Sequence, residues 1–413
     1  MRNFFLLLAM STMVIPPISH ATDDSPVRKR ATVELTGAAQ QLHRSCLVID
    51  GHNDLPWRLR STNKQMLNDR DLRQPQKDFH TDIPRLRQGG LGAQFWSAWV
   101  PSNPAKRDQA VQMTLEQIDL IHRMVRAYPD VFEMADTVAD IERIHRSGKI
   151  ASMIGVEGGH SINNSLAVLR LYYQLGVRYM TLTHSDNVDW ADSATDTPRL
   201  NGLSPFGEQV VLEMNRLGML VDISHVSPEV MRHTLRITRA PVIASHSSAL
   251  AIAQHPRNVP DDVLELIKKN NGVVMVNFYS GFIVPEAARV SQNMFKIGRQ
   301  LREKYQDDEQ YRMAWEQWFR ENPFPRGNIH ILVDHIDHIV KVAGVDHVGL
   351  GSDYDGISQT PEQLEDVSKY PYITQELLNR GYKPDEIRKI LGGNLLRCLR
   401  QAEQVAQQLQ KTR

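Results

Sequence analysis

Eight short runs of apolar and β-branched residues constrain what this 413-residue chain can fold into. Helical patterns separate the runs, and such alternation is typical of a parallel sheet. The runs cover residues 46–50, 92–100, 151–156, 177–183, 219–223, 241–244, 272–278 and 347–351. Helical candidates include residues 108–127, 165–175, 206–217 and 228–239, the last with an N-cap at Ser227. Eight strands with helices between them predict an α/β fold, a closed (β/α)8 barrel of the TIM type.

The composition is that of a folded soluble protein. Lysine and arginine together number 48, as do aspartate and glutamate, so no basic surface for a nucleic-acid partner is predicted. The chain is 41% hydrophobic and 23% charged, which argues against disordered, fibrous and polytopic membrane classes. Its length suits either two ordinary domains or one large barrel. No internal repeat or low-complexity tract marks a second domain.

The N-terminal segment has the pattern of a secretory signal peptide. Arg2 precedes an apolar run over residues 4–15, and small residues at the end of the segment offer a cleavage site after Ala21. The run is shorter than the roughly 20 residues that a membrane-spanning helix needs. Two prolines at 16–17 close it. Removal of the segment is therefore favoured over a membrane anchor.

These features predict an exported protein, periplasmic or secreted. Residues 1–21 would be removed, and residues 22–413 would form a single catalytic domain. The polar C-terminus, residues 401–413, lacks the hydrophobic tail of a lipid-anchor signal, so no stable membrane anchor is expected. The two cysteines, Cys46 and Cys398, can be buried thiols or a bridge between the two ends of the fold.

Residues 285–328 do not fit a bare barrel, because the segment is long, charged and aromatic. It has the pattern of a helical insertion before the last strand. Its aromatic residues at roughly helical spacing are Phe295, Tyr305, Tyr311, Trp315, Trp318 and Phe319. Packing of these side chains onto the barrel is favoured over a lid or a dimer surface.

Side chains that can bind metal stand at or just after the ends of the runs. They are His52, Asp54, Glu157, His184, His225, His246 and Asp353. One histidine at such a position is more often structural than functional. In a parallel barrel, however, all the strand ends meet at one face, where the loops build the active site. The number of these residues therefore predicts a metal site at that face.

Five of them form a predicted ligand set for two cations. His52 and Asp54 are two positions apart at a strand end, where alternate side chains point the same way, so both can face one cation. His225 and His246 follow adjacent strands and can hold a second cation, which Glu157 can share through its two oxygens. Mixed nitrogen and carboxylate donors suit zinc better than calcium or magnesium. Two Zn²⁺ per chain are therefore predicted.

The neighbouring polar residues predict hydrolysis of a short zwitterion. Two cations about 3.5 to 4 Å apart can hold a bridging hydroxide and polarise a carbonyl. Asp353 can handle a proton or meet a substrate ammonium, and His184 can stabilise the oxyanion of a tetrahedral intermediate. Arg257 can grip a carboxylate with two hydrogen bonds. Asp50 and Asp355 are expected to support ligands through hydrogen bonds.

Seven motifs run in order along roughly residues 46–400. They are IDGHND at 49–54, EG at 157–158, TH at 183–184, DISH at 222–225, SHS at 245–247, HPRN at 255–258 and GSDYDG at 351–356. This series resembles the membrane dipeptidase (renal dipeptidase) family of zinc peptidases. The resemblance implies a distorted barrel of the metal-dependent hydrolase type. It also implies one zinc ion on His52 and Asp54, a second on His225 and His246, and Glu157 between them.

The same resemblance assigns roles around the metals. It implies that His184 and Arg257 bind substrate, that Asp353 is the proton-handling carboxylate, and that Trp57 and Tyr279 are pocket walls. The polar C-terminus and the low cysteine count differ from the animal members. The chain therefore resembles a bacterial exported member, and a homodimer is left open because the insertion alters the surface.

Three functions follow from these residues. The favoured one is a dinuclear zinc dipeptidase that acts through a metal-bridging hydroxide on dipeptides with free amino and carboxyl ends, with Asp353, Glu157 and His184 as catalytic groups. The alternative is a metal-dependent hydrolase of the same barrel type acting on a β-lactam or another amide or ester. An exported binding protein without turnover is disfavoured, because the proton-handling residues are present.

Overall fold

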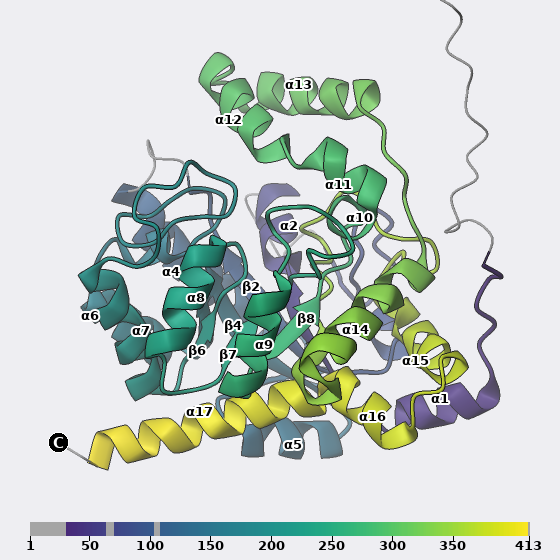
Figure 1. Ribbon diagram of the computed structural model, residues 1–413. Helices are drawn as coiled ribbons and strands as arrows, with labels where there is room; N and C mark the ends of the chain where they lie inside the picture. The colour runs from purple at the N-terminus through teal and green to yellow at the C-terminus, as the bar shows by residue number, and fades with distance from the viewer. Residues whose placement is uncertain (1–29, 63–69, 103–107, 412–413) are drawn as a thin grey trace, which may run out of the picture. The chain divides into compact units, whose positions relative to one another are not determined.

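A closed barrel of parallel strands forms the centre of the structure (Figure 1). The computed structural model describes residues 30–62, 70–102 and 108–411, and this part of the chain contains nine strands. They are β1 Val48–Asn53, β2 Leu91–Trp99, β3 Phe132–Met134, β4 Ile150–Glu157, β5 Val177–Thr181, β6 Leu220–Asp222, β7 Val242–Ala244, β8 Val273–Val276 and β9 Val348–Leu350. Their order is β2-β1-β9-β8-β7-β6-β5-β4-β3, and a further pairing of β2 with β4 closes the ring. The predicted (β/α)8 barrel is confirmed.

One of the nine strands, β3, has no counterpart among the eight predicted runs. It pairs with the first part of β4, where Phe132 lies opposite Ile150 and Met134 opposite Ser152. The fifth strand pairs with β4 only from Ile154 onward. Because β4 is eight residues long and β5 only five, β3 satisfies backbone groups that β5 does not reach. Three residues are too few for a periodic signal.

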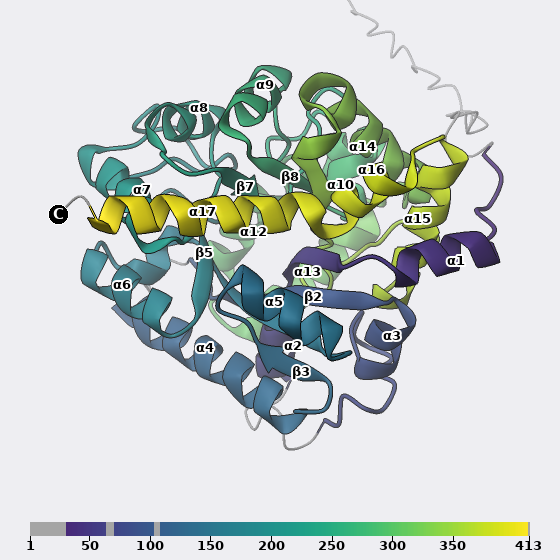
Figure 2. The ribbon, with the colours of Figure 1, turned by 90° about the horizontal axis from the view of Figure 1, so that it is seen from below.

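The barrel strands are buried on both faces, which explains their near-continuous apolar runs. Every residue of β1, β4 and β8 is buried. One apolar core contains Ile49, Phe95, Tyr179 and Met275 from four different strands. Helix α17, Asn394–Lys411, runs across the end of the barrel where the strands begin and adds side chains to the same core (Figure 2). This helix closes the barrel opposite the predicted site.

Helices surround the barrel and connect its strands (Figures 1 and 2). They include α1 Gly37–Arg44, α2 Leu55–Thr62, α3 Ile83–Gln88, α4 Ala110–Ala127, α5 Val138–Arg146, α6 Leu166–Gln174, α7 Pro205–Leu217, α8 Pro228–Ile237, α9 Asp261–Asn270, α14 Ile329–Ala343, α15 Tyr370–Asn379 and α16 Pro384–Arg388. The Ser227 side chain accepts a hydrogen bond from the Val230 amide, and Pro228 follows in the first turn of α8. The predicted N-cap is therefore confirmed.

The predicted helical insertion lies between β8 and β9. It contains α11 Pro285–Ser291, α12 Met294–Lys304 and α13 Asp308–Glu321, which follow the short α10 Ser280–Ile283. Figure 1 shows α12 and α13 at the end of the barrel opposite α17. The insertion is therefore on the side where the strands end and where the predicted site residues stand.

The two cysteines are buried free thiols. The Cys46 Sγ lies 3.2 Å from the carbonyl oxygen of Leu42, which precedes β1. The Cys398 Sγ, in α17, lies 3.3 Å from the carbonyl oxygen of Asn271. Of the two possibilities that the sequence leaves open, the structure therefore has the unbridged one.

The predicted export concerns the N-terminal segment of the chain. Residues 1–21, the predicted signal peptide, lie outside the described residues, so cleavage after Ala21 stays a prediction. No helix in the described part of the chain is long and apolar enough to cross a membrane. Residues Val33–Arg413 form one compact unit, and the single catalytic domain over residues 22–413 also stays a prediction.

Gly351, directly after β9, provides a test of the barrel packing. A Cβ atom there would overlap the backbone oxygen of Ser245 and lie 3.1 Å from the Cα atom of His246. Backbone atoms cannot move aside as a flexible side chain can, so we expect Gly351→Ala to lower the free energy of unfolding by about 2 kcal/mol. Denaturant unfolding measures this change. The control Gly37→Ala adds a Cβ with nothing within 4 Å, and equal stability of both variants would contradict the prediction.

Candidate metal centre and substrate pocket

The seven predicted metal-competent residues lie together at the carboxyl ends of the barrel strands. His52 belongs to β1, and Glu157 is the last residue of β4. The others follow their strands by at most three residues: Asp54, His184, His225, His246 and Asp353. Because the strands are parallel, residues up to 301 positions apart in the chain meet at one end of the barrel.

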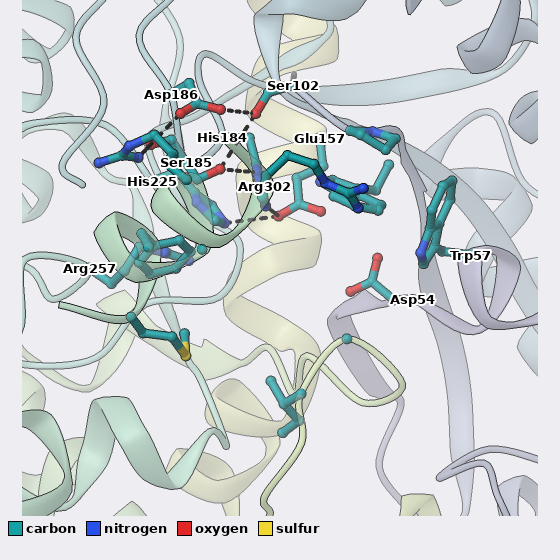
Figure 3. Close-up of a pocket in the computed structure, with 18 of the residues that line it drawn as sticks. Asp54, Trp57, Ser102, Glu157, His184, Ser185, Asp186, His225, Arg257 and Arg302 are labelled. Carbon is teal, nitrogen blue, oxygen red and sulfur yellow. Dashed lines mark hydrogen bonds and ion pairs between the residues drawn. The ribbon is translucent and has the colours of Figure 1, made fainter. Parts of the chain in front are cut away.

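The carboxylate of Glu157 occupies the middle of this cluster. Its Oε2 lies 3.4 Å from the Nε2 of His52. Its Oε1 lies 2.9 Å from the Nε2 of His225 and 3.4 Å from that of His246. Figure 3 shows the His225 contact as a dashed line. The two oxygens therefore face different histidines, which is the arrangement that a bridging carboxylate requires.

The donor atoms fit divalent transition-metal ions. Three groups have ligand atoms within 4.8 Å of one another: His52 with Glu157 and His246, Glu157 with His184 and His225, and His52 with Asp54 and Asp353. The buried Nε2 of His52 has no hydrogen-bond partner, although Asp54 Oδ2 lies 3.2 Å away. The Nε2 atoms of His225 and His246 are 2.9 Å apart. Buried imidazole nitrogens converging on carboxylates form a site typical of zinc.

Two of the histidines are held from behind through their other ring nitrogen. The Nδ1 of His52 lies 2.7 Å from the Tyr179 hydroxyl, and the Nδ1 of His246 lies 2.7 Å from the Ser245 hydroxyl. A fixed Nδ1 directs Nε2 into the centre, as is usual for histidines that bind metal. No local pattern links Tyr179 to His52, which is 127 positions away, whereas Ser245 stands directly before His246 in the SHS motif. Neither partner was predicted from the sequence.

Two buried aspartates support the loops that carry the ligands. Asp50 accepts hydrogen bonds from the backbone amides of His52 and Ser352, at 3.3 and 2.8 Å, and from the Tyr370 hydroxyl at 2.8 Å. It therefore ties the β1 end to the residue before Asp353. The predicted supporting function of Asp50 agrees with these contacts.

Asp222 makes the equivalent connection between β6 and β7. It accepts hydrogen bonds from the backbone amides of Ser224 and Ser245 at 3.0 and 2.8 Å, and from the Ser245 hydroxyl at 2.6 Å. These serines precede His225 and His246. Asp222 is the first residue of the DISH motif, and the sequence alone predicts no function for it. The signal that could have found it is an aspartate shortly before a ligand, as with Asp50.

The charges at the centre are strongly coupled. Burial raises the pKa of Glu157, but His52, His184, His225 and His246 outweigh it, so the net pKa lies well below the usual value. Burial lowers the pKa of His225 and His246, which leaves their imidazoles neutral and able to bind a cation. Burial lowers the pKa of His52, but Tyr179 and the charges of Glu157 and Asp54 outweigh it, so the net pKa lies well above the usual value. Glu157, His225 and His246 thus have the protonation states that metal ligands need, and a cation would displace the proton of His52.

Asp353 differs from the other carboxylates of the site. Burial raises its pKa to about 8, with contributions from the charges of Asp54 and Glu157. Its Oδ2 accepts a hydrogen bond from the Asn277 amide group at 2.9 Å.

Asp355, two residues after Asp353, accepts a hydrogen bond from the His80 backbone amide at 2.8 Å. Asp355 thus supports the loop rather than a predicted ligand side chain.

A cavity of about 1290 Å³ opens in front of this centre (Figure 3). Its lining includes the predicted substrate and wall residues Trp57, His184, Arg257, Tyr279 and Asp353, together with Asp54, Glu157 and His225. The Trp57 ring meets the Trp99 ring edge-on at 4.5 Å, and the Tyr279 ring meets Phe282 in the same way at 4.8 Å. The predicted site residues are therefore all at the centre or on the cavity wall.

Arg257 is the buried cation of the cavity. Its guanidinium donates to the carbonyl oxygen of His246 at 3.2 Å and to the Ser247 hydroxyl at 3.3 Å. Burial lowers its pKa to about 10, so the group stays charged at neutral pH. Its Nε is buried without a hydrogen-bond partner. A buried guanidinium with spare donors can bind a carboxylate.

The insertion supplies the outer wall of the same cavity. Among the lining residues are Phe295, Arg302, Tyr311, Trp315 and Phe319. The Trp315 and Phe319 rings stack at 5.3 Å, and the Arg302 guanidinium lies 3.7 Å from the centre of the Tyr311 ring. The aromatics thus contact one another and the cavity, and do not only pack the insertion onto the barrel. Their spacing in the sequence favours packing onto the barrel over a lid or a dimer surface, and it does not indicate that they line the cavity.

Tyr179 provides a test of the support behind His52. Tyr179→Phe removes the hydroxyl at 2.7 Å from His52 Nδ1, so we expect zinc to bind about 10- to 100-fold more weakly. Competition with a chelator of known affinity measures this. Tyr172→Phe is the matched control. The Tyr172 hydroxyl donates to the carbonyl oxygen of Ser161 at 2.8 Å and not to a predicted ligand. Equal zinc affinity in both variants would contradict the prediction that the Tyr179 hydroxyl orients His52 for metal binding.

Comparison with known proteins identifies relatives along nearly the whole chain. The chain matches Membrane dipeptidase (Peptidase family M19) over residues 37–413. It is 42% identical to Dipeptidase 3 from Mus musculus over 372 residues, and 42% identical to Dipeptidase 3 from Homo sapiens over 382 residues. These alignments cover 89% and 91% of this chain, and this chain spans about two thirds of the relatives, 66% and 69% of their lengths.

Solved structures give the same result. The probable dipeptidase PvdM from Pseudomonas aeruginosa has a TM-score of 0.75 and 26% sequence identity, covering 89% of this chain and 98% of that chain. The dipeptidase AC, a metallopeptidase of family M19, has a TM-score of 0.70 and 25% identity, covering 86% and 98%. The chain therefore belongs to the membrane dipeptidase family, peptidase family M19, whose members are metallo-dipeptidases.

Proposed function

We propose that this protein is a dinuclear zinc dipeptidase that hydrolyses dipeptides with free amino and carboxyl ends. The observation that carries the proposal is the Glu157 carboxylate, whose two oxygens face His52 on one side and His225 and His246 on the other. A buried arginine lies in the same cavity. The family relationship supports the dipeptide as substrate class.

His52 and Asp54 would hold one zinc ion, His225 and His246 the other, and Glu157 both. The chemistry that two zinc ions supply in such a site is Lewis-acid polarisation of the peptide carbonyl and activation of a water nucleophile. The protein contributes fixed donor positions, because the hydroxyls of Tyr179 and Ser245 contact the Nδ1 atoms of His52 and His246.

The residues around the centre would bind and orient the substrate. Arg257 would bind the terminal carboxylate through its guanidinium donors. Asp353 would hold the ammonium end or move a proton from the attacking water to the leaving amine. His184 would donate a hydrogen bond from Nε2 to the oxygen that becomes negative in the transition state. Trp57 and Tyr279 would form the walls along which the substrate lies.

The size of the substrate follows from the position of Arg257. Its side chain is only 1% exposed, so the carboxylate that it binds must enter the cavity. A free carboxylate beside the reacting carbonyl occurs in dipeptides and at the C-terminal bond of longer peptides. An ammonium partner at Asp353, in the same cavity as Arg257, would restrict the substrate to dipeptides. A β-lactam or another amide or ester is the alternative, because the metal chemistry is the same. Activity on these substrates with none on any dipeptide would favour that alternative.

Export and a homodimer also belong to this proposal. An exported dipeptidase would be cleaved after Ala21, which N-terminal sequencing of protein recovered from the periplasm or medium would detect. A homodimer would be detected by the mass of the purified protein in solution.

Metal removal is the first test of the proposed chemistry. We expect chelator-treated protein to lose dipeptide hydrolysis and to regain it with zinc, because the peptide bond is not activated by the side chains alone. Glu157→Ala should lose bound zinc together with activity, measured by elemental analysis and an amino-acid release assay. His338→Ala, which removes a histidine paired with Asp261 on α9, should keep both. Full activity of the metal-free protein would exclude the proposal.

Arg257→Ala tests the carboxylate contact. A lost charge-assisted contact costs about 2 kcal/mol, so we expect KM for a dipeptide to rise roughly 30-fold. The corresponding dipeptide amide lacks the carboxylate, and its KM should change little. Arg232→Ala, which removes a surface arginine paired with Asp262, is the control. An equal loss on both substrates would count against this function of Arg257, provided that zinc content is unchanged.

A further inference from the structure

Helix α12 of the insertion is tied to the loop that carries His184. The guanidinium of Arg299 donates to the carbonyl oxygens of Ser185 and Thr195, at 3.3 and 2.8 Å. It also donates to the Asp186 carboxylate at 3.2 Å. Three contacts from one planar group hold this loop in a defined position. The loop follows β5, so the insertion reaches a segment that begins at the metal centre.

The His184 ring is held by the same loop. Its Nδ1 lies 3.0 Å from the Ser185 hydroxyl, as Figure 3 shows. The other ring nitrogen, Nε2, lies 3.7 Å from Glu157 Oε1. The ring also lies 4.4 Å from the His225 ring, centre to centre. The contact of Nδ1 is therefore the Ser185 hydroxyl, in the segment that Arg299 holds.

The hydrogen-bond pattern selects a tautomer. A lone pair on Nε2 would face the Glu157 carboxylate, which electrostatics disfavour, whereas an N–H there is attracted to it. Nδ1 then accepts, and Ser185 donates its proton to it. The Ser102 hydroxyl lies 3.5 Å from that of Ser185. It donates its own proton to the Asp186 carboxylate, so the Ser185 proton is available for His184. With Ser185 in place, His184 presents an N–H donor to the cavity.

We propose that Ser185 and Arg299 are positioning residues for His184, so that the insertion supports the reaction through the hydrogen-bond donor of His184. The inference rests on the proposed dipeptidase function for its kinetic consequence. Ser185 fixes the tautomer and the ring, and Arg299 fixes Ser185 and Asp186 from α12. A donor that is displaced by a fraction of an ångström stabilises the transition state less, while substrate binding through Arg257 is retained.

A double-mutant cycle tests this inference with the zinc-loaded enzyme. We expect Arg299→Ala to lower kcat for a dipeptide about tenfold with less than about a threefold change in KM. In a His184→Ala background, the same substitution should change kcat by less than about twofold, because the group through which it acts is absent. An equal loss in both backgrounds, or a rise in KM alone, would show that Arg299 acts independently of His184 and would overturn the inference.

Two further variants separate the hydroxyl from general loop damage. Ser185→Ala should lower kcat about as much as Arg299→Ala, and Ser185→Thr should restore most of it because the hydroxyl remains. Arg312→Ala is the matched control, since Arg312 lies on α13 of the same insertion and pairs with Glu316 at 2.7 Å. Loss of kcat in Arg312→Ala equal to that in Arg299→Ala would overturn the inference.

A readout that does not depend on turnover keeps the two proposals distinguishable. NMR of protein with ¹⁵N-labelled histidine reports the tautomer of His184, assigned by comparison with His184→Ala. We expect a single Nε2–H tautomer in the wild type and a mixture in Ser185→Ala and Arg299→Ala. Identical His184 signals in all three proteins would overturn the inference. If the wild type cleaves no dipeptide, the proposed function fails, and this spectrum alone decides whether Ser185 and Arg299 position His184.

Discussion

The arrangement of the site depends on one carboxylate buried among histidines. Glu157 is the last residue of the long strand β4, and its oxygens lie within 3.4 Å of the Nε2 atoms of His52, His225 and His246. An ionised carboxylate in this position is stable only because cationic or metal-bound partners surround it. The ligand loops must therefore bring their imidazoles to the same few ångströms, which constrains the ends of several strands at once.

Buried aspartates and close backbone contacts meet that constraint. Asp50 joins the β1 end to the loop after β9, and Asp222 joins the β6 end to the loop after β7. Each aspartate accepts backbone amide hydrogen bonds that would otherwise be unsatisfied inside the barrel. The same rim has no room for a side chain at Gly351. Hydrogen bonds and close packing at the barrel rim thus hold the loops that carry the predicted ligands.

The insertion is the part of the site that sequence patterns describe least well. Its helices could be predicted from spacing and aromatic content, but their position over the cavity could not, because no residue of the insertion is near a ligand in the chain. Arg299 reaches Asp186 across 113 positions. A contact of this kind depends on the path of the whole chain. The short strand β3 was missed for a different reason, since three residues carry no periodicity.

The alternation of strand and helix patterns was enough to predict the barrel and the residues that gather at one end of it, because parallel strands must place the residues after their ends on one face. The folded arrangement fixes which oxygen of Glu157 faces which histidine, and it places the Tyr179 hydroxyl next to the Nδ1 of His52. It also decided that both cysteines are unbridged and that α12 and α13 form a cavity wall. These features are set by distances between segments remote in the chain, which no local pattern of residues specifies.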